Sequence, residues 1–167
     1  MTTANRPEVR ERGGANGDSQ APLLVAVDFS EDSREAVLWA SREAECLGYR
    51  LMILHVVHDP ASSPGFYQQM DVDWLRPMTD LAQEMMNVFL KEIRTKHPSL
   101  TALATAEAKL VTGLPASRIV EVAKAIHAPL IVIGSRGRTG LPHILLGSVS
   151  ERVVQLAPMP IVVVKQR

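Results

Sequence analysis

Short apolar runs alternate with stretches of helical periodicity along most of this chain, and this alternation constrains its fold more than any other feature. Five runs have the length of strands, at residues 23–27, 50–57, 105–113, 130–134 and 161–164. Most of these runs are apolar on both faces, which is typical of strands buried in a parallel sheet. Strands that are separated by helices predict a parallel sheet covered on both faces. We therefore expect a doubly wound α/β domain with an open five-stranded parallel sheet.

Helix signals fill the intervals between these runs. Ser30 is a candidate N-cap, and the charges of Glu31 and Asp32 suit the positive end of a helix dipole. Gly48 is a candidate C-terminal stop. The next helix is predicted from apolar residues that we expect to face the core, namely Leu75, Met78, Ala82, Met85, Phe89 and Ile93. Two more helices are expected to begin at Pro115 and near Ser148.

Composition limits the compartment and the partners. The chain has 167 residues, of which 46% are hydrophobic and 4% aromatic, with 18 basic and 18 acidic side chains. Zero net charge and few aromatic residues disfavour a nucleic-acid partner, and no apolar run approaches the roughly 18 residues of a membrane span. A lone cysteine, Cys46, which we expect to be buried on its helix, favours a reducing compartment. We therefore expect a cytoplasmic protein without a nucleic-acid or membrane partner.

The first residues differ from the rest of the chain. Residues 1–21 contain no Ile, Leu, Phe, Trp, Tyr or Cys, and they lack the apolar segment of a signal peptide. Such a segment buries too little apolar surface to offset the entropy lost on ordering. We expect residues 1–21 to form a disordered tail and residues 22–167 to form one domain.

The stretch after the fourth predicted strand, residues 134–148, is here called the glycine loop. Gly134, Gly137 and Gly140 follow the strand, and Gly147 precedes Ser148 at a predicted helix start. Glycine lets backbone N–H groups approach an anion, and a helix N-terminus adds partial positive charge. The spacing is neither a Walker A motif nor G-x-G-x-x-G. The glycines alone therefore leave a phosphate site and a simple connection equally open.

The glycine spacing resembles the ATP-binding motif of the universal stress protein family, G-2x-G-9x-G-[S/T], with Gly134, Gly137, Gly147 and Ser148 at its fixed positions. The opening VAVDFSEDS, the ILHVV of the second strand and the closing strand after Pro-x-Pro also look like this family. The resemblance covers about residues 22–166, and it identifies the predicted domain as a universal stress protein-like nucleotide-binding domain.

The resemblance implies a sheet order of 3-2-1-4-5, in which the first and fourth strands are neighbours and a crevice opens between their carboxyl ends. Asp28 and Gly134 stand at those two ends. The positions implied to bind ATP are Ala26, Val27 and Asp28 beside the adenosine, Val56 at the adenine, Ile133 and Gly134 at the ribose, and Gly137, Gly147, Ser148, Val149 and Ser150 at the phosphates. Mg²⁺ or Mn²⁺ is implied on the phosphate oxygens, with no protein ligand. Ala26 and Val27 depart from the Pro-Thr that is common in the family.

The same resemblance implies an ATP-binding stress-response protein. In this hypothesis, nucleotide occupancy changes the order of the glycine loop and thereby a surface for a protein partner, and residues 161–164 join two copies in a homodimer. No general base and arginine finger occur in a recognised arrangement, so we expect no catalytic residues and no rapid phosphoryl transfer. The alternatives are a slow ATPase or autophosphorylating enzyme, a nucleotide-free dimeric interaction module, and a site for another adenine nucleotide such as a cyclic one.

Three local interpretations stay open at this level. Ser148 and Glu151 form the pattern of a capping box, which requires no ligand. Asp28 either meets the nucleotide or merely ends its strand and pairs with a cation. Arg136 and Arg138 either clamp phosphate or are solvated loop residues.

Overall fold

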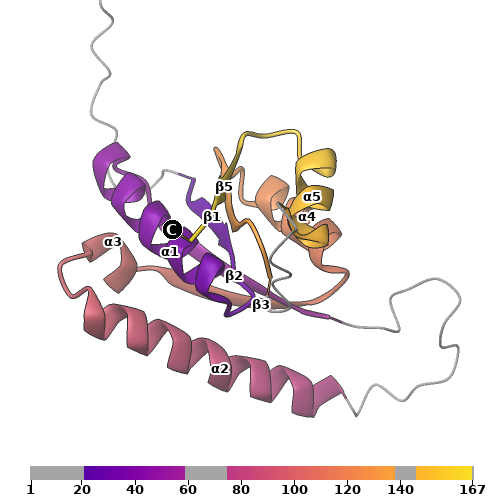
Figure 1. The fold of residues 1–167 in the computed structure, drawn as a ribbon, viewed down its shortest axis with the longest axis horizontal. Helices are drawn as coiled ribbons and strands as arrows, with labels where there is room; N and C mark the ends of the chain where they lie inside the picture. Colours follow the sequence, from indigo (N-terminus) through magenta and orange to yellow (C-terminus); the bar gives the residue numbers. More distant parts are fainter. Residues whose placement is uncertain (1–20, 59–74, 138–145, 167) are drawn as a thin grey trace, which may run out of the picture.

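The computed structural model describes residues 21–58, 75–137 and 146–166 (Figure 1). Its strands are β1 (Leu23–Ala26), β2 (Leu51–His58), β3 (Glu107–Gly113), β4 (Ile131–Gly134) and β5 (Ile161–Val164). Its helices are α1 (Glu31–Leu47), α2 (Leu75–Lys96), α3 (Thr101–Ala104), α4 (Pro115–Ala125) and α5 (Ser148–Leu156). Apart from Ala21, the predicted tail lies outside the described residues, as do Arg138 and Gly140 of the glycine loop.

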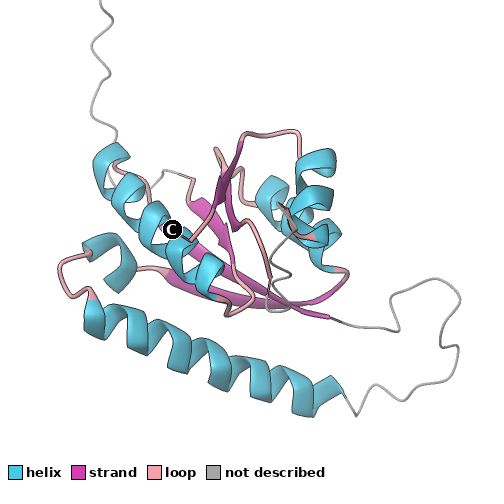
Figure 2. Ribbon diagram, in the orientation of Figure 1, coloured by secondary structure: helices cyan, strands magenta, loops and turns pink. Residues whose placement is uncertain are grey.

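The five strands form one sheet in the order β3-β2-β1-β4-β5, and every pairing between neighbours is parallel. The predicted fold class and the implied strand order are thus confirmed. Helices α1, α2 and α3 lie on one side of the sheet, and α4 and α5 lie on the other (Figures 1 and 2). The central position of β1 explains its continuous apolar run, because helices cover both of its faces.

Alternate residues of β1 point into two separate cores. Leu23 and Val25 join one cluster with buried residues of α1 and α2, among them Val37 and Phe89. Leu24 and Ala26 join the other cluster, with residues of α4 and α5. All four residues of β1 are buried. The end of β1 is therefore held rigidly from both sides, which fixes the place where the next residues enter the site.

The predicted helix boundaries on both sides of the sheet are confirmed. The Ser30 hydroxyl accepts a hydrogen bond of 3.2 Å from the Ser33 N–H at the start of α1. Gly48 ends this helix in the left-handed region, at φ 71°, where a Cβ is unfavourable. Pro115 is the first residue of α4. These local signals depend on neighbours in sequence, which is why the sequence reveals them.

Three local predictions were wrong. The third strand begins at Glu107, two residues later than predicted, because the short helix α3 (Thr101–Ala104) precedes it. On α2, Ala82, Phe89 and Ile93 are buried as predicted, but Met78 is 38% exposed and Met86, which was not predicted to face the core, is fully buried. Cys46 is exposed. Among the described residues, no helix has both the length and the apolar content needed to cross a bilayer.

Candidate functional site

The candidate site lies where β1 and β4 end side by side. These strands are parallel neighbours, and Ala26 lies opposite Ile133. The sheet continues from β1 to β2 in one direction and from β4 to β5 in the other, so the strand order reverses between β1 and β4. Parallel sheets open a crevice at such a switch point. A cavity of about 290 Å³ lies there.

The cavity brings together all eleven residues that the sequence singled out. They are Ala26, Val27, Asp28, Val56, Ile133, Gly134, Gly137, Gly147, Ser148, Val149 and Ser150. Six more residues line it, namely Ser33, Leu54, His55, Pro115, Ile119 and Arg136. The lining comes from both layers of helices and from three strands, so the cavity depends on the complete fold.

One part of the cavity wall is apolar. Leu54 and Val56 contribute from β2, and Pro115 and Ile119 contribute from the first turns of α4. Pro115 and Ile119 are four residues apart, so they lie on one side of their helix. The sequence alone did not reveal α4 as part of the site. The sequence contained one indirect indication that α4 lies at the site. Helix α4 begins just after β3, and β3 ends beside the end of β2, where His58 lies opposite Gly113.

The opposite part of the cavity is formed by the N-terminus of α5. Gly147 is the N-cap, its N–H donates to the Ser135 carbonyl at 2.7 Å, and the first hydrogen bond along the helix runs from the Glu151 N–H to the Gly147 carbonyl at 2.9 Å. The N–H groups of the first turn, at Ser148, Val149 and Ser150, therefore have no acceptor within the helix. Such a turn attracts an anion through these N–H groups and through the helix dipole.

The predicted capping box is absent from this helix start. Ser148 is the first helical residue rather than the N-cap, and no side chain forms the capping hydrogen bond. The hydroxyl that does act locally belongs to Ser150, which is buried and donates to the Gly134 carbonyl at 2.7 Å. This bond fastens the end of β4 to the first turn of α5. The pattern S-x-x-E was therefore misleading, because the boundary of α5 lies one residue earlier than a capping box requires.

The three described glycines of the loop differ in why a side chain would not fit. A Cβ on Gly134 would lie 2.9 Å from backbone atoms of Asp32 and Ser33, so close packing of β4 on α1 requires this glycine. A Cβ on Gly137 would lie 2.8 Å from Asp28 Oδ2. On Gly147 the nearest atom would be 3.5 Å away, an ordinary contact, and its φ is −70°. Nothing in the described residues requires Gly147 to be glycine, so the space beside it is available to a ligand.

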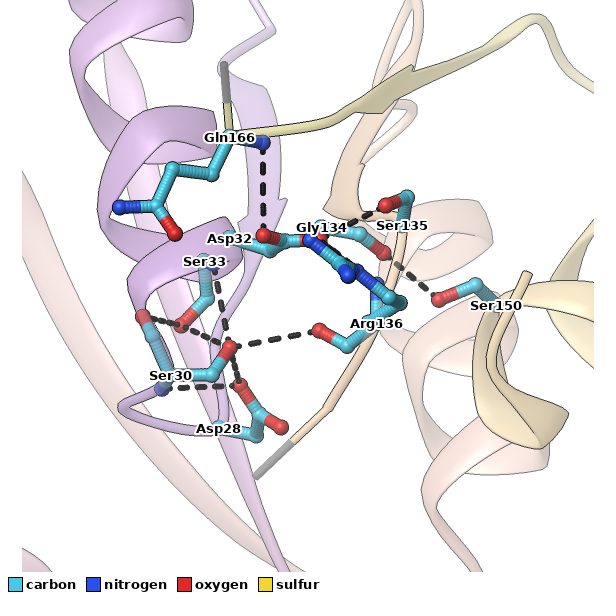
Figure 3. A network of polar contacts seen from close by, with 9 residues as sticks. All are labelled: Asp28, Ser30, Asp32, Ser33, Gly134, Ser135, Arg136, Ser150 and Gln166. Atoms are coloured by element: carbon cyan, nitrogen blue, oxygen red, sulfur yellow. Dashed lines mark hydrogen bonds and ion pairs between the residues drawn. The ribbon is translucent and has the colours of Figure 1, made fainter. Parts of the chain in front are cut away.

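Asp28 lies in a tight turn that begins just after β1. Its Oδ1 accepts from the Ser30 N–H at 3.1 Å and from the Ser30 hydroxyl at 2.5 Å (Figure 3). Phe29, between them, has a positive φ of 66°, which is rare for a bulky side chain. Such strain persists only where the surroundings impose it. The turn holds the Asp28 carboxyl beside Gly137, at the cavity.

Asp32 forms the most extensive polar network near the site, and the sequence analysis assigned it only to the helix dipole. Its Oδ2 accepts from the Ser135 hydroxyl at 2.7 Å and from the Arg136 N–H at 3.0 Å, and it pairs with Arg136 Nε at 3.4 Å (Figure 3). Its Oδ1 accepts from the Gln166 N–H at 3.3 Å. Burial raises the pKa of Asp32, but hydrogen bonds to both oxygens outweigh burial and hold this pKa below its ordinary value.

Two curated relatives are similar to this chain in sequence. A universal stress protein of Thermus aquaticus is 31% identical over 143 residues, covering 86% of this chain and 97% of the relative. A universal stress protein of Mycobacterium tuberculosis is 34% identical over 150 residues, covering 88% of this chain but 46% of the relative. The chain thus spans nearly all of the first relative and about half of the second.

A solved structure is similar in fold. The universal stress protein of Archaeoglobus fulgidus in complex with dAMP has a TM-score of 0.57 and 26% identity, covering 86% of this chain and 97% of that one. The profile of the universal stress protein family matches residues 21–165. This match includes every described strand and helix, and both sides of the cavity. The chain belongs to the universal stress protein family.

Proposed function

We propose that the cavity between β1 and β4 binds an adenine nucleotide, and that this nucleotide is ATP. The observation that carries the proposal is the pairing of two unlike walls around one space. The first turn of α5 offers N–H groups without helical acceptors, beside a glycine whose missing side chain the protein itself does not require. The opposite wall is apolar and comes from β2 and α4. A charged phosphate group on an apolar base needs these two environments.

Most of the lining residues then have a part in holding the nucleotide. Val56, with Leu54 and Ile119, would pack on the base, and Ala26, Val27 and Asp28 would border the adenosine. Ile133 and Gly134 would border the ribose. Gly137 and Gly147 would leave room for the phosphates, which the N–H groups of Ser148, Val149 and Ser150 would bind. Because the Ser150 hydroxyl donates to Gly134, Ser150 would serve the phosphate through its backbone.

A divalent ion, Mg²⁺ or Mn²⁺, would be held by the phosphate oxygens. The described residues contain no group of three or more His, Cys, Asp or Glu side chains that could hold a metal ion. The ion would offset repulsion between the phosphates and the nearby Asp28 and Asp32 carboxyls. The dAMP complex of the Archaeoglobus fulgidus protein supports an adenine nucleotide as the ligand class.

The proposed role is that of a sensor or regulator in the cytoplasm. Nucleotide occupancy would change the order of the glycine loop and alter a surface for a protein partner. The side chains nearest the loop form hydrogen bonds within the fold: Ser135 and Arg136 bind Asp32, and the Ser30 hydroxyl binds Asp28. A serine whose hydrogen bonds serve the fold is poorly prepared to act as a nucleophile.

The same proposal includes a homodimer through β5. Among the described strands, β5 pairs with β4 alone and forms an edge of the sheet. Apolar side chains are exposed on β5 and on the neighbouring α5, at Val154 (47%) and Val163 (38%). An exposed apolar edge strand is prone to pair with another chain. A second copy of this chain would cover it.

The binding proposal is tested by titrating the protein with ATP and Mg²⁺ in a calorimeter. We expect saturable heat with one nucleotide per chain. Parallel titrations with AMP and cyclic AMP measure the preference among adenine nucleotides, and tighter binding of either would replace ATP as the ligand. Absence of heat with all three at millimolar concentration would reject the proposed function in favour of a nucleotide-free interaction module. Phosphate release that Gly147→Val abolishes would instead favour the slow ATPase.

A further inference from the structure

The Asp32 carboxylate connects two segments that are far apart in sequence. It is 4% exposed, in the first turn of α1. One oxygen holds Ser135 and Arg136 at the beginning of the glycine loop, and the other holds the N–H of Gln166, just beyond β5. Figure 3 shows the carboxylate between these two segments. The chain leaving the edge strand and the beginning of the loop are thus bound to the same side chain.

Ser135 strengthens this connection through its backbone. Its N–H donates to the Val164 carbonyl at 2.7 Å, and its carbonyl accepts from the Gly147 N–H at 2.7 Å. Its hydroxyl donates to Asp32. One residue therefore joins the end of β5, the start of α1 and the N-cap of α5. A shift of Ser135 would move Gly147 and, with it, the first turn of α5.

A carboxylate suits this position better than any other side chain of its size. Its two oxygens accept only, and the four described hydrogen bonds to Asp32 all come from N–H or O–H donors of Ser135, Arg136 and Gln166. An amide would turn an NH₂ group toward some of these donors. A buried carboxylate is costly unless it is paired and hydrogen-bonded. Here the Arg136 guanidinium pairs with the Asp32 carboxylate, and the Ser135 hydroxyl and the Arg136 and Gln166 N–H groups donate hydrogen bonds to it.

Asp32 also lies directly behind the first glycine of the loop. A Cβ on Gly134 would come within 3.0 Å of the Asp32 Cβ and within 2.9 Å of its carbonyl carbon. The cavity wall at Gly134 therefore depends on the placement of Asp32 as well as on its hydrogen bonds. Asp32 itself does not line the cavity.

We propose that Asp32 is a positioning residue for the nucleotide site, and that it makes nucleotide affinity depend on the segment that follows β5. This inference rests on the proposed function. Asp32 does not line the cavity itself, so its effect on the nucleotide passes through Ser135, Arg136 and Gly147. The residues at the end of β5 would then help to position the first turn of α5, which binds the phosphates.

Two pairs of variants test the connection from its two ends. Gln166→Pro removes the N–H that binds Asp32, whereas Gln166→Ala keeps it and serves as the matched control. Asp32→Asn keeps the size of the side chain and removes its charge. Ser135→Ala removes one donor and leaves the backbone bonds of the loop in place. Calorimetric titration with ATP and Mg²⁺, on variants shown to be folded by thermal unfolding, gives the dissociation constants.

We expect Asp32→Asn to raise the Kd by about tenfold or more and Gln166→Pro to raise it by about threefold or more, with Gln166→Ala unchanged. The double variant Asp32→Asn with Gln166→Pro is expected to bind ATP no more weakly than Asp32→Asn alone, because both substitutions remove the same connection. In the nucleotide-free protein, the NMR signal of the Arg136 amide is expected to move in Asp32→Asn and Gln166→Pro. A loss of global stability alone would not give this pattern.

Each other result has a definite meaning. A Kd within about twofold of wild type in folded Asp32→Asn, or in Ser135→Ala if Asp32→Asn does not fold, overturns the positioning role. Equal effects of Gln166→Pro and Gln166→Ala overturn the connection to β5. No binding of any adenine nucleotide by the wild-type chain overturns the proposed function, and this inference with it.

Discussion

At the scale of single residues, the glycines of the loop separate requirements of the fold from requirements of a ligand. Gly134 packs against the backbone of α1, and Gly137 faces the Asp28 carboxyl, so a larger residue at either position disturbs the protein itself. Gly147 has room for a Cβ and an ordinary φ. A motif with fixed glycines therefore contains at least two kinds of constraint. Gly147 is the position that tests the ligand alone.

Gly147→Val is expected to raise the Kd for ATP by about tenfold or more, because its branched side chain would fill the space beside the first turn of α5. Because valine is a poorer N-cap than glycine, the free energy of unfolding is expected to fall by no more than about 1 kcal/mol. Calorimetry and urea unfolding measure the two quantities. Gln155→Val, an exposed position on the same helix that does not line the cavity, is the control. Unaltered affinity in Gly147→Val would place the phosphates elsewhere.

Asp32 gives a pH-dependent prediction. The pKa of Asp32 is lowered in the folded state. Its contribution to stability is therefore complete above the pKa that Asp32 has in the unfolded chain, and it is lost as the pH falls through the pKa of Asp32 in the folded protein. At neutral pH, Asp32→Asn is expected to lower the free energy of unfolding by about 1–3 kcal/mol. Below pH about 4 the difference between wild type and variant is expected to shrink. Urea unfolding over this range measures it, and a difference independent of pH would show that the charge of Asp32 does not stabilise the fold.

At the scale of elements, the sequence predicts what local patterns determine and misses what depends on rotation or on distant neighbours. The strands, the Ser30 cap and the start of α4 at Pro115 follow from nearby residues. On α2, Ala82, Phe89 and Ile93 are buried as predicted, whereas Met78 is exposed, because spacing gives the period of a helix but not its exact rotation against the sheet. The short helix α3 carries no side-chain cap and is held by Glu45 of α1, which accepts from the Thr101 hydroxyl and the Ala102 N–H.

The edge strand β5 is the element whose partner can be tested by association. If the wild-type chain forms the proposed homodimer, Val163→Lys, which places a charge on the exposed edge, is expected to give a monomer. The control is Leu81→Lys, at an exposed apolar position on α2, which packs near β2 and β3 and away from the β5 edge. This variant is expected to leave the proposed dimer intact. Sedimentation equilibrium of the three proteins measures their masses. A monomeric wild type, or a Val163→Lys dimer, would contradict pairing through β5.

At the scale of the whole molecule, the candidate site was predictable because the topology gathers its residues. Asp28 and Gly134 are far apart in sequence, but Asp28 follows β1 by two residues, Gly134 ends β4, and the strand order makes those strands neighbours. The contributions of Asp32, Pro115 and Ile119 were not predictable, because each depends on how a helix rotates and where it crosses the sheet. Local patterns therefore identify the ends of the strands, whereas packing decides what surrounds them.

The central claim is that an adenine nucleotide binds between the first turn of α5 and the apolar wall at β2. Its most direct test is an amide-resolved NMR spectrum of the labelled protein during titration with ATP and Mg²⁺. We expect the amide signals of Ser148, Val149 and Ser150 to shift together with that of Val56, while those of Leu81 and Val88 on α2 stay in place. Shifts at α2 without shifts in α5, or no shifts at millimolar nucleotide, would contradict the claim.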